Sequence, residues 1–352
     1  MKKAAVVIGV NKTKDNALQK LKSAAAGAKA VAQWLGGEGY DVTCLTDDTE
    51  KVTASAVFEA ISQFAVLPVK YDFLLAYFSG HGYWVSRSDY WLLSGAPNNP
   101  NESINLRSSM ELAKYSGIPN IVFISDACRS IPLNRSGQLL GGYDAFPNHP
   151  EINTASKIDF FKATSESLPA YETSLKGESR SVLTHALISA YKEPTADMVT
   201  ELETDTGKIT VIPNRKLEGY LQHKVNGILA ETSITLSQRL EITVPSDDQT
   251  YIARVHMDDA TQIPKKAIPS SHQPQTRNLD DFFDNQPVKS FSTQDTDLPR
   301  IKTMIPDMQT DHFESETGFI IQGAVVRDVA CTKGPANANA EIVSHGNDQD
   351  SR

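Results

Sequence analysis

Short apolar runs alternate with stretches of helical periodicity from residue 1 to about residue 130. Uninterrupted apolar runs are typical of strands buried on both faces, whereas apolar residues that recur every three or four positions predict helices packed on a core. This alternation indicates βαβ units and a mainly parallel sheet. The predicted strands are 4–10, 42–45, 73–78 and 121–124, and the predicted helices are 17–35 and 53–64.

After residue 130 the pattern is less regular. Frequent Gly, Pro and Asn between 130 and 157 predict a long surface loop. Beyond this loop, apolar spacing predicts two more helices, at 182–191 and 216–229, and late strands at 240–244 and 251–255.

From about residue 256 the chain becomes polar and rich in Pro, a composition that favours a linker or tail over a second core. One short apolar segment, 318–326, interrupts it, and we expect this segment to dock on the core, to bind a partner or to remain free. We therefore predict a folded domain at 1–255 and a largely irregular tail at 256–352, where a protein partner would bind.

Composition narrows the classes of function. The 352 residues include 43 acids and 34 Lys and Arg, for a net charge of -9, and no dense basic run, so nucleic acid is not an expected partner. The three cysteines, Cys44, Cys128 and Cys331, are far apart, which argues against a disulfide framework and a paired-cysteine zinc site. No apolar stretch approaches the length of a membrane span. We expect a cytoplasmic protein without a metal or other cofactor and without a membrane partner.

Two predicted strands end in tight polar turns that carry chemistry. His81 follows the strand at 73–78, and Cys128 follows the strand at 121–124. Since the carboxyl ends of parallel strands form a crevice, these side chains are expected to lie together. A thiol attacks carbonyl carbon, and imidazole can act as both base and acid. A lone His or Cys at a strand end is most often structural, but the joint placement favours a catalytic pair.

These motifs, at 79–82 and 125–129, resemble those of the caspase-like cysteine peptidases, the clan of caspases, metacaspases and paracaspases. The resemblance covers about residues 3–250 and is closest to bacterial metacaspase-like or paracaspase-like members. It implies an α/β/α sandwich with His81 as general base and acid and Cys128 as nucleophile. It also implies that the backbone N–H groups of Gly82 and Cys128 form the oxyanion hole.

The residue two positions before the nucleophile bears on specificity. Caspases, which cut after Asp, resemble one another in having Gln there, whereas metacaspases and paracaspases, which cut after Arg or Lys, have Asp, and this chain has Asp126. A carboxylate at the floor of a pocket attracts a cation. The segment ending at Glu172 resembles a paracaspase segment that supplies a second pocket acid. Against this, those relatives carry an Asp where this chain has Gly27. Asp126 could alternatively serve only to cap its turn.

Two arginines have weaker signals. Arg180 lies in a segment that resembles the edge strand along which substrates of this clan bind, although it is equally consistent with a surface cation. Arg135 lies in the predicted surface loop, where self-cleavage is one hypothesis and an intact loop the other. No calcium site is expected, because the acidic pair of many metacaspases aligns with Asn105 and Leu106.

The sequence therefore predicts a cysteine endopeptidase that cleaves protein or peptide substrates after Arg or Lys. Two alternatives remain at this point. One is a catalytically silent caspase-like scaffold that recruits partners through its tail. The other is a peptidase of the same fold that cuts after Asp.

Overall fold

The computed structural model describes residues 1–15, 18–168, 170–175, 178–205, 207–231 and 238–256, together with the backbone of two short strands beyond residue 318. Of residues 173–175 and 178–180 the backbone alone is described. The chain divides into two compact units, Met1–Gln275 and Thr276–Arg352, and the described domain belongs to the first. Within the described residues, no helix is both long enough and apolar enough to cross a bilayer.

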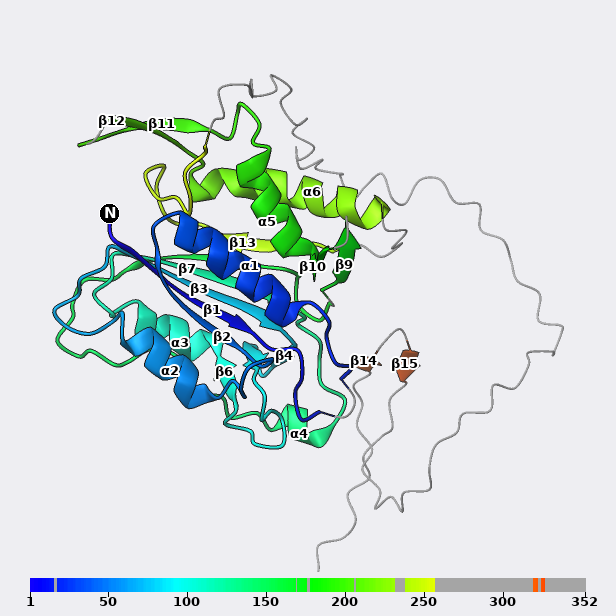
Figure 1. The fold of residues 1–352 in the computed structure, drawn as a ribbon. Helices are drawn as coiled ribbons and strands as arrows, with labels where there is room; N and C mark the ends of the chain where they lie inside the picture. Colours follow the sequence, from blue (N-terminus) through cyan, green and yellow to red (C-terminus); the bar gives the residue numbers. More distant parts are fainter. Residues whose placement is uncertain are drawn as a thin grey trace, which may run out of the picture. The chain divides into compact units, whose positions relative to one another are not determined.

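A six-stranded sheet forms the centre of the domain, in the order β13-β8-β7-β3-β1-β2 (Figure 1). The strands β2, β1, β3, β7 and β8 pair in parallel, and β13 runs antiparallel to β8. Every residue of the interior strands β1 and β3 is buried, which explains their uninterrupted apolar sequences. The strands are β1 (Lys3–Gly9), β2 (Asp41–Thr46), β3 (Phe73–Gly80), β7 (Asn120–Ala127), β8 (Lys157–Lys162) and β13 (Glu241–Thr243).

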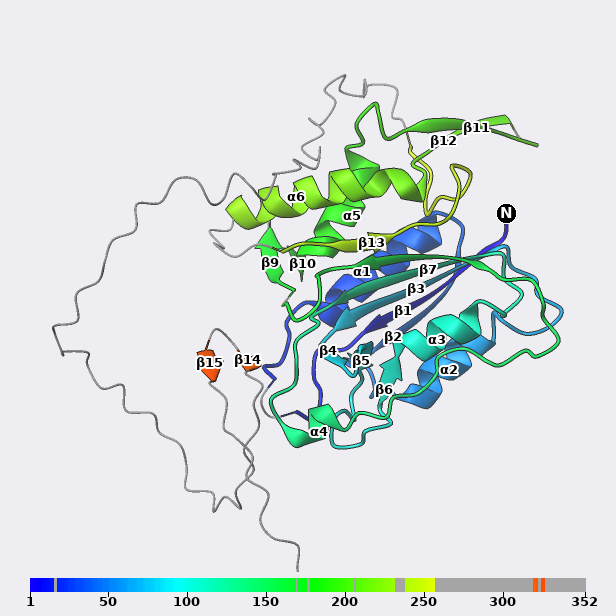
Figure 2. The same ribbon diagram turned by 180° about the vertical axis from the view of Figure 1, so that it is seen from behind.

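Helices cover both faces of this sheet (Figures 1 and 2). On one face α1 (Ala24–Gly37), α5 (Val182–Lys192) and α6 (Leu217–Glu231) pack on side chains such as Val7 and Leu75. On the other face α2 (Ala54–Ser62) and α3 (Leu106–Ala113) contact the alternate strand residues, such as Val6 and Leu74. The two cores follow from the alternation of side chains along each strand. This architecture confirms the predicted caspase-like α/β fold.

Smaller elements surround the sheet. A three-stranded antiparallel sheet, β4-β5-β6, begins directly after β3, and the hairpin β9-β10 leads into α5. Their bounds are β4 (Gly82–Val85), β5 (Ser88–Leu92), β6 (Ser103–Asn105), β9 (Glu172–Leu175) and β10 (Glu178–Ser181). The remaining elements are the hairpin β11 (Thr200–Thr204) and β12 (Gly207–Val211), the short helices α4 (Arg135–Gln138) and η1 (Asn214–Lys216), and the hairpin β14 (Phe319–Ile321) and β15 (Ala324–Val326).

Three sequence predictions differ from the structure. The helix predicted to start at residue 17 starts only at Ala24, because Asn11 holds the preceding segment as a loop: its carbonyl accepts from Leu21 and its side chain accepts the N–H of Ala25. The predicted strand 251–255 is wrong; it makes one isolated bridge, and Lys3 Nζ binds two of its carbonyls instead. The predicted loop 130–157 contains the short helix α4.

The predicted tail from residue 256 lies almost entirely outside the described residues. Its apolar segment 318–326 holds β14 and β15, which pair as an antiparallel hairpin. Whether this segment docks on the domain or recruits a partner stays a prediction.

Candidate active site

The register between β3 and β7 places the two predicted catalytic residues at one edge of the sheet. Gly80 at the end of β3 pairs with Ala127 at the end of β7. His81 and Cys128 are the next residues on each strand, and both line the same small hollow. The hollow has a volume of about 30 Å³, which is room for one or two water molecules.

His81 is oriented by a carbonyl from the loop before α1. Its side chain is almost buried, and Nε2 lies 2.7 Å from the carbonyl oxygen of Gln19. Because a carbonyl can only accept, Nε2 carries the proton, which leaves Nδ1 as the basic nitrogen. Burial lowers the pKa of His81, while the Gln19 carbonyl acts in the opposite direction. The imidazole is therefore neutral at pH 7.

The Cys128 thiol contacts the backbone that precedes β9. The N–H of Ala170 donates to Sγ at 3.3 Å, and Sγ in turn donates to the carbonyl oxygen of Ala170 at 3.6 Å. Burial raises the pKa of Cys128, and the negative charges of Asp126 and Glu172 raise it further. Thiol and imidazole are thus both neutral at rest, so the thiol must lose its proton at the moment of attack.

The glycines around His81 allow close backbone approach. A Cβ added to Gly82 would lie 2.4 Å from the carbonyl oxygen of Cys128, and one added to Gly80 would lie 2.6 Å from the Phe78 ring. The backbone of Gly82 therefore runs directly beside that of Cys128. These are the two residues whose N–H groups the sequence analysis assigned to the oxyanion hole.

Replacing Gly82 by Ala is expected to lower kcat/KM at least about 100-fold, because the new methyl group forces the backbone beside Cys128 to move. Peptide hydrolysis and thermal unfolding of the purified variant measure the effect. Gly219→Ala is the matched control, since no atom lies within 4 Å of a Cβ at that position in α6. Full activity of Gly82→Ala would show that this close approach is not needed.

Asp126 lies at the end of β7 and lines the same hollow, with its side chain 3% exposed. The hydroxyls of Ser181 and Thr184 donate to its Oδ2, and the Tyr77 hydroxyl lies 3.4 Å from that oxygen. Among the described residues none donates to Oδ1. Burial raises the pKa of Asp126 to about 6, and the three hydroxyls oppose this shift. The group is therefore largely a carboxylate at pH 7.

Glu172, the predicted second acid, lines the hollow as well. Its Oε2 accepts the N–H of Lys22 at 3.2 Å, and its Oε1 accepts the N–H of Ser23 at 3.3 Å. The start of β9 is thereby tied to the chain entering α1. At Gly27, the position at which the resemblance implies an Asp in relatives, a Cβ would lie 4.0 Å from the Tyr77 hydroxyl, so that position borders the hydroxyl group that contacts Asp126.

An ion cluster that no sequence pattern predicts surrounds the residue after the nucleophile. Arg129 is 3% exposed, with Nε 2.5 Å from Asp89 and a terminal nitrogen 2.5 Å from Glu241. Lys162 pairs with the same two acids, at 3.2 Å and 2.5 Å. These charges join β5, β8 and β13 immediately beside Cys128, and breaking a buried pair of this kind commonly costs about 3–5 kcal/mol.

Neither of the two arginines with weak sequence signals is among the described residues that line the hollow. Arg180 is part of β10, where its backbone pairs with Thr173, and its side chain lies outside the described residues. Arg135 is exposed and begins α4, which Asn134 caps by accepting the N–H of Gly137 at 2.7 Å. Since peptidases bind extended chains, cleavage at Arg135 would require this helical turn to open.

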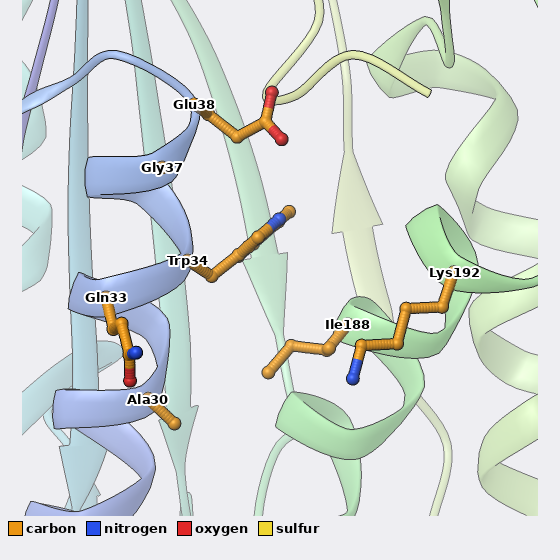
Figure 3. A pocket seen from close by; sticks show the side chains of 7 residues that line it. All are labelled: Ala30, Gln33, Trp34, Gly37, Glu38, Ile188 and Lys192. Carbon is orange, nitrogen blue, oxygen red and sulfur yellow. The ribbon is translucent and has the colours of Figure 1, made fainter. Parts of the chain in front are cut away.

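A larger hollow of about 400 Å³ lies between α1 and α5 (Figure 3). Side chains such as Trp34 of α1, Glu38 directly after α1 and Lys192 of α5 surround it. No histidine or cysteine is among the described residues that line it, so the nucleophilic chemistry belongs to the smaller hollow.

Comparisons with known proteins identify the family of this chain. A family model described as the caspase domain matches residues 2–219. The structure is similar to that of protein GSU0716 from Geobacter sulfurreducens, at 15% identity, 76% coverage of this chain, 100% of that chain and a TM-score of 0.49. It is also similar to Caspase-1 from Spodoptera frugiperda, at 13% identity, 69% coverage of this chain, 86% of that chain and a TM-score of 0.44. No curated protein matches the chain. Because the family model matches more than half of its length, this chain belongs to the caspase-domain family and is a cysteine-type peptidase.

Proposed function

We propose that this peptidase cuts protein substrates on the carboxyl side of Lys or Arg, with Cys128 as nucleophile and His81 as general base and acid. The observation that carries the proposal is the lining of one hollow, which contains the thiol, the imidazole and two carboxylates, Asp126 and Glu172. Among the described side chains of that lining there is no Lys or Arg. The site therefore has an acidic wall beside its nucleophile.

The geometry supports a two-step acyl transfer. His81 takes the thiol proton as Sγ attacks the carbonyl carbon of the substrate. The resulting oxyanion accepts hydrogen bonds from the backbone N–H groups of Gly82 and Cys128. The imidazolium then protonates the leaving amine, so that a thioester remains on Cys128. Water, deprotonated by His81, hydrolyses this thioester and restores the thiol. Throughout these steps the Gln19 carbonyl fixes the ring and favours its protonated form.

Electrostatics favour a cationic side chain at the cleavage site. Asp126 and Glu172 attract an ammonium or guanidinium and repel a substrate aspartate. This argues against the alternative of cleavage after Asp. The backbone of β10, including Arg180, would pair with the substrate residues that precede the cleaved bond.

The resting arrangement also requires a local opening. A hollow of about 30 Å³ is too small for a Lys or Arg side chain, and Ala170 contacts Sγ from both its N–H and its carbonyl. The segment around Ala170 must therefore shift before a substrate binds. An event that moves this segment would activate the enzyme.

The activity should depend on pH through two groups. Catalysis requires a neutral His81, whose pKa lies below its usual value, and a charged Asp126, whose pKa is about 6. Both requirements fail as the pH falls, so kcat/KM for a basic peptide is expected to drop below about pH 6. A pH profile of kcat/KM measures this limb, and Asp126→Asn should leave only the part due to His81. A profile flat from pH 7 to 4.5 would contradict the assignment.

The direct test is hydrolysis of fluorogenic peptides that differ only in the residue before the reporter: Lys, Arg, Asp or Ala. Cleavage restricted to Lys and Arg is expected. Cleavage restricted to Asp would reverse the assigned specificity. The assay is repeated with added cell extract as a source of activator. If no peptide is cleaved with or without the extract, the result favours the scaffold alternative.

A further inference from the structure

The two oxygens of Asp126 differ in their surroundings. Oδ2 has three hydroxyls around it, those of Ser181, Thr184 and Tyr77, and the Tyr77 hydroxyl also lies 2.6 Å from that of Thr184. A carboxylate oxygen has two lone pairs, so these donors leave no site on Oδ2 for a ligand. Oδ1 is buried and accepts from none of the described residues. Asp126 therefore offers a ligand one oxygen.

Glu172 likewise cannot accept both N–H groups of a guanidinium side by side. Two consecutive backbone N–H groups, those of Lys22 and Ser23, each donate to a different carboxylate oxygen. They occupy the carboxylate in the way that the two parallel N–H groups of a guanidinium would. Each oxygen of Glu172 keeps one lone pair, and the carboxylate keeps its negative charge.

The chemistry of the two cations points in the same direction. An ammonium is a compact charge that single acceptors can bind. A guanidinium is a plane of three nitrogens whose five N–H groups need several acceptors, and any that are buried without one are costly. Single-point acceptors therefore suit the compact charge of lysine better than the arginine fork.

We infer that this pocket selects lysine over arginine, with Asp126 Oδ1 as the direct partner of the substrate ammonium and the Ser181–Thr184–Tyr77 hydroxyls as the groups that exclude a bidentate guanidinium. This inference rests on the proposed function and narrows its substrate class. The hydroxyls act on the substrate through Asp126, so they are positioning residues for specificity.

The test compares two fluorogenic peptides that differ only in Lys or Arg before the cleaved bond, using the full chain. The kcat/KM for the Lys peptide is expected to exceed that for the Arg peptide at least about fivefold. The double variant Tyr77→Phe/Thr184→Val removes two of the three hydroxyls from Oδ2, so its ratio should shift at least about threefold toward Arg. Since the ratio is measured on one preparation, it does not depend on how much of the variant is folded.

Ser109→Ala is the control, because it also removes a buried hydroxyl, one that accepts the N–H of Ala145 beside α3. Its Lys-to-Arg ratio should equal that of the unchanged chain. Equal or faster cleavage of the Arg peptide by the unchanged chain would overturn the inference while leaving the proposed function intact.

If neither peptide is cleaved, the proposed function fails in that assay, and binding then tests the pocket. Peptides ending in a free Lys or Arg are titrated into the Cys128→Ala chain by calorimetry. Tighter binding of the Lys peptide supports the inference, and equal or tighter binding of the Arg peptide contradicts it.

Discussion

Replacing Cys128 by Ala is expected to abolish peptide hydrolysis, with kcat/KM falling by at least about 10⁴-fold. The variant has no atom that can form the acyl intermediate, and removal of a nucleophile from a residue pair that acts as a unit commonly costs factors of this size. The fold should persist, because both hydrogen bonds of the thiol to described residues are with the backbone of Ala170 and alanine fits the same space. Steady-state hydrolysis of the best basic peptide and the thermal midpoint of unfolding measure the two effects.

Cys44→Ala is the matched control for this variant. Cys44 lies at the surface on the edge strand β2 and is not among the residues that line the hollow with His81, so it has no neighbouring base to activate it. Its activity should equal that of the unchanged chain. A Cys128→Ala chain that keeps more than about 1% of the activity would exclude Cys128 as the nucleophile, whatever its position beside His81.

How much of this site the sequence predicts depends on how local the signal is. His81 and Cys128 follow fully buried strands, and an uninterrupted apolar run is a local signal that survives in the structure as the adjacent strands β3 and β7. Glu172 was expected in the same pocket from resemblance to a family segment, and it lines the hollow. His81 and Cys128 needed only the order of elements along the chain, whereas Glu172 needed the resemblance.

The groups that orient His81 and bind Asp126 come from distant parts of the chain. No spacing of residues in the sequence indicates these contacts. The Gln19 carbonyl that orients His81 belongs to a loop whose apolar residues happen to follow helical spacing, so it was assigned to a helix. Ser181 and Thr184 reach Asp126 from the start of α5, where Ser181 is also the N-cap. A capping serine is a common feature, and nothing in the sequence connects it to a carboxylate on β7.

The sequence pattern did not predict the sheet β4-β5-β6, and the reason lies in the turn between β4 and β5. Ser86 and Arg87 connect β4 to β5 with φ of 50° and 62°. Two-residue hairpin turns with positive φ usually carry Asn-Gly or Asp-Gly, and that is the signal by which hairpins are recognised. Here two ordinary residues adopt the conformation, so the hairpin leaves little trace in the sequence. The buried rings of Trp91 and Phe78, stacked 4.9 Å apart, hold β5 against β3 instead.

Replacing Asp126 by Asn is expected to lower kcat/KM for basic peptides at least about 100-fold. The amide has nearly the same shape and can still accept the Ser181 and Thr184 hydroxyls, but it has no charge for the substrate cation, and truncating one partner of a buried charge pair commonly costs 2–5 kcal/mol or more. Most of the loss should appear in KM. Asp48→Asn, which makes the same change of net charge on the surface, should have no effect.

The same variant should be more stable than the unchanged chain at neutral pH. A carboxyl pKa raised to about 6 means that the folded state binds a proton more tightly than the unfolded state does, so this group favours folding below about pH 4 and loses that contribution as the pH rises through 6. The neutral amide avoids this cost, and urea unfolding at pH 7 should show a gain on the order of 2 kcal/mol. If Asp126 served only to cap its turn, substitution would lower stability and leave the choice between Lys and Asp peptides unchanged. Lost activity with gained stability is the result that assigns Asp126 to substrate binding, because a carboxylate that weakens the fold is retained only where its charge is used.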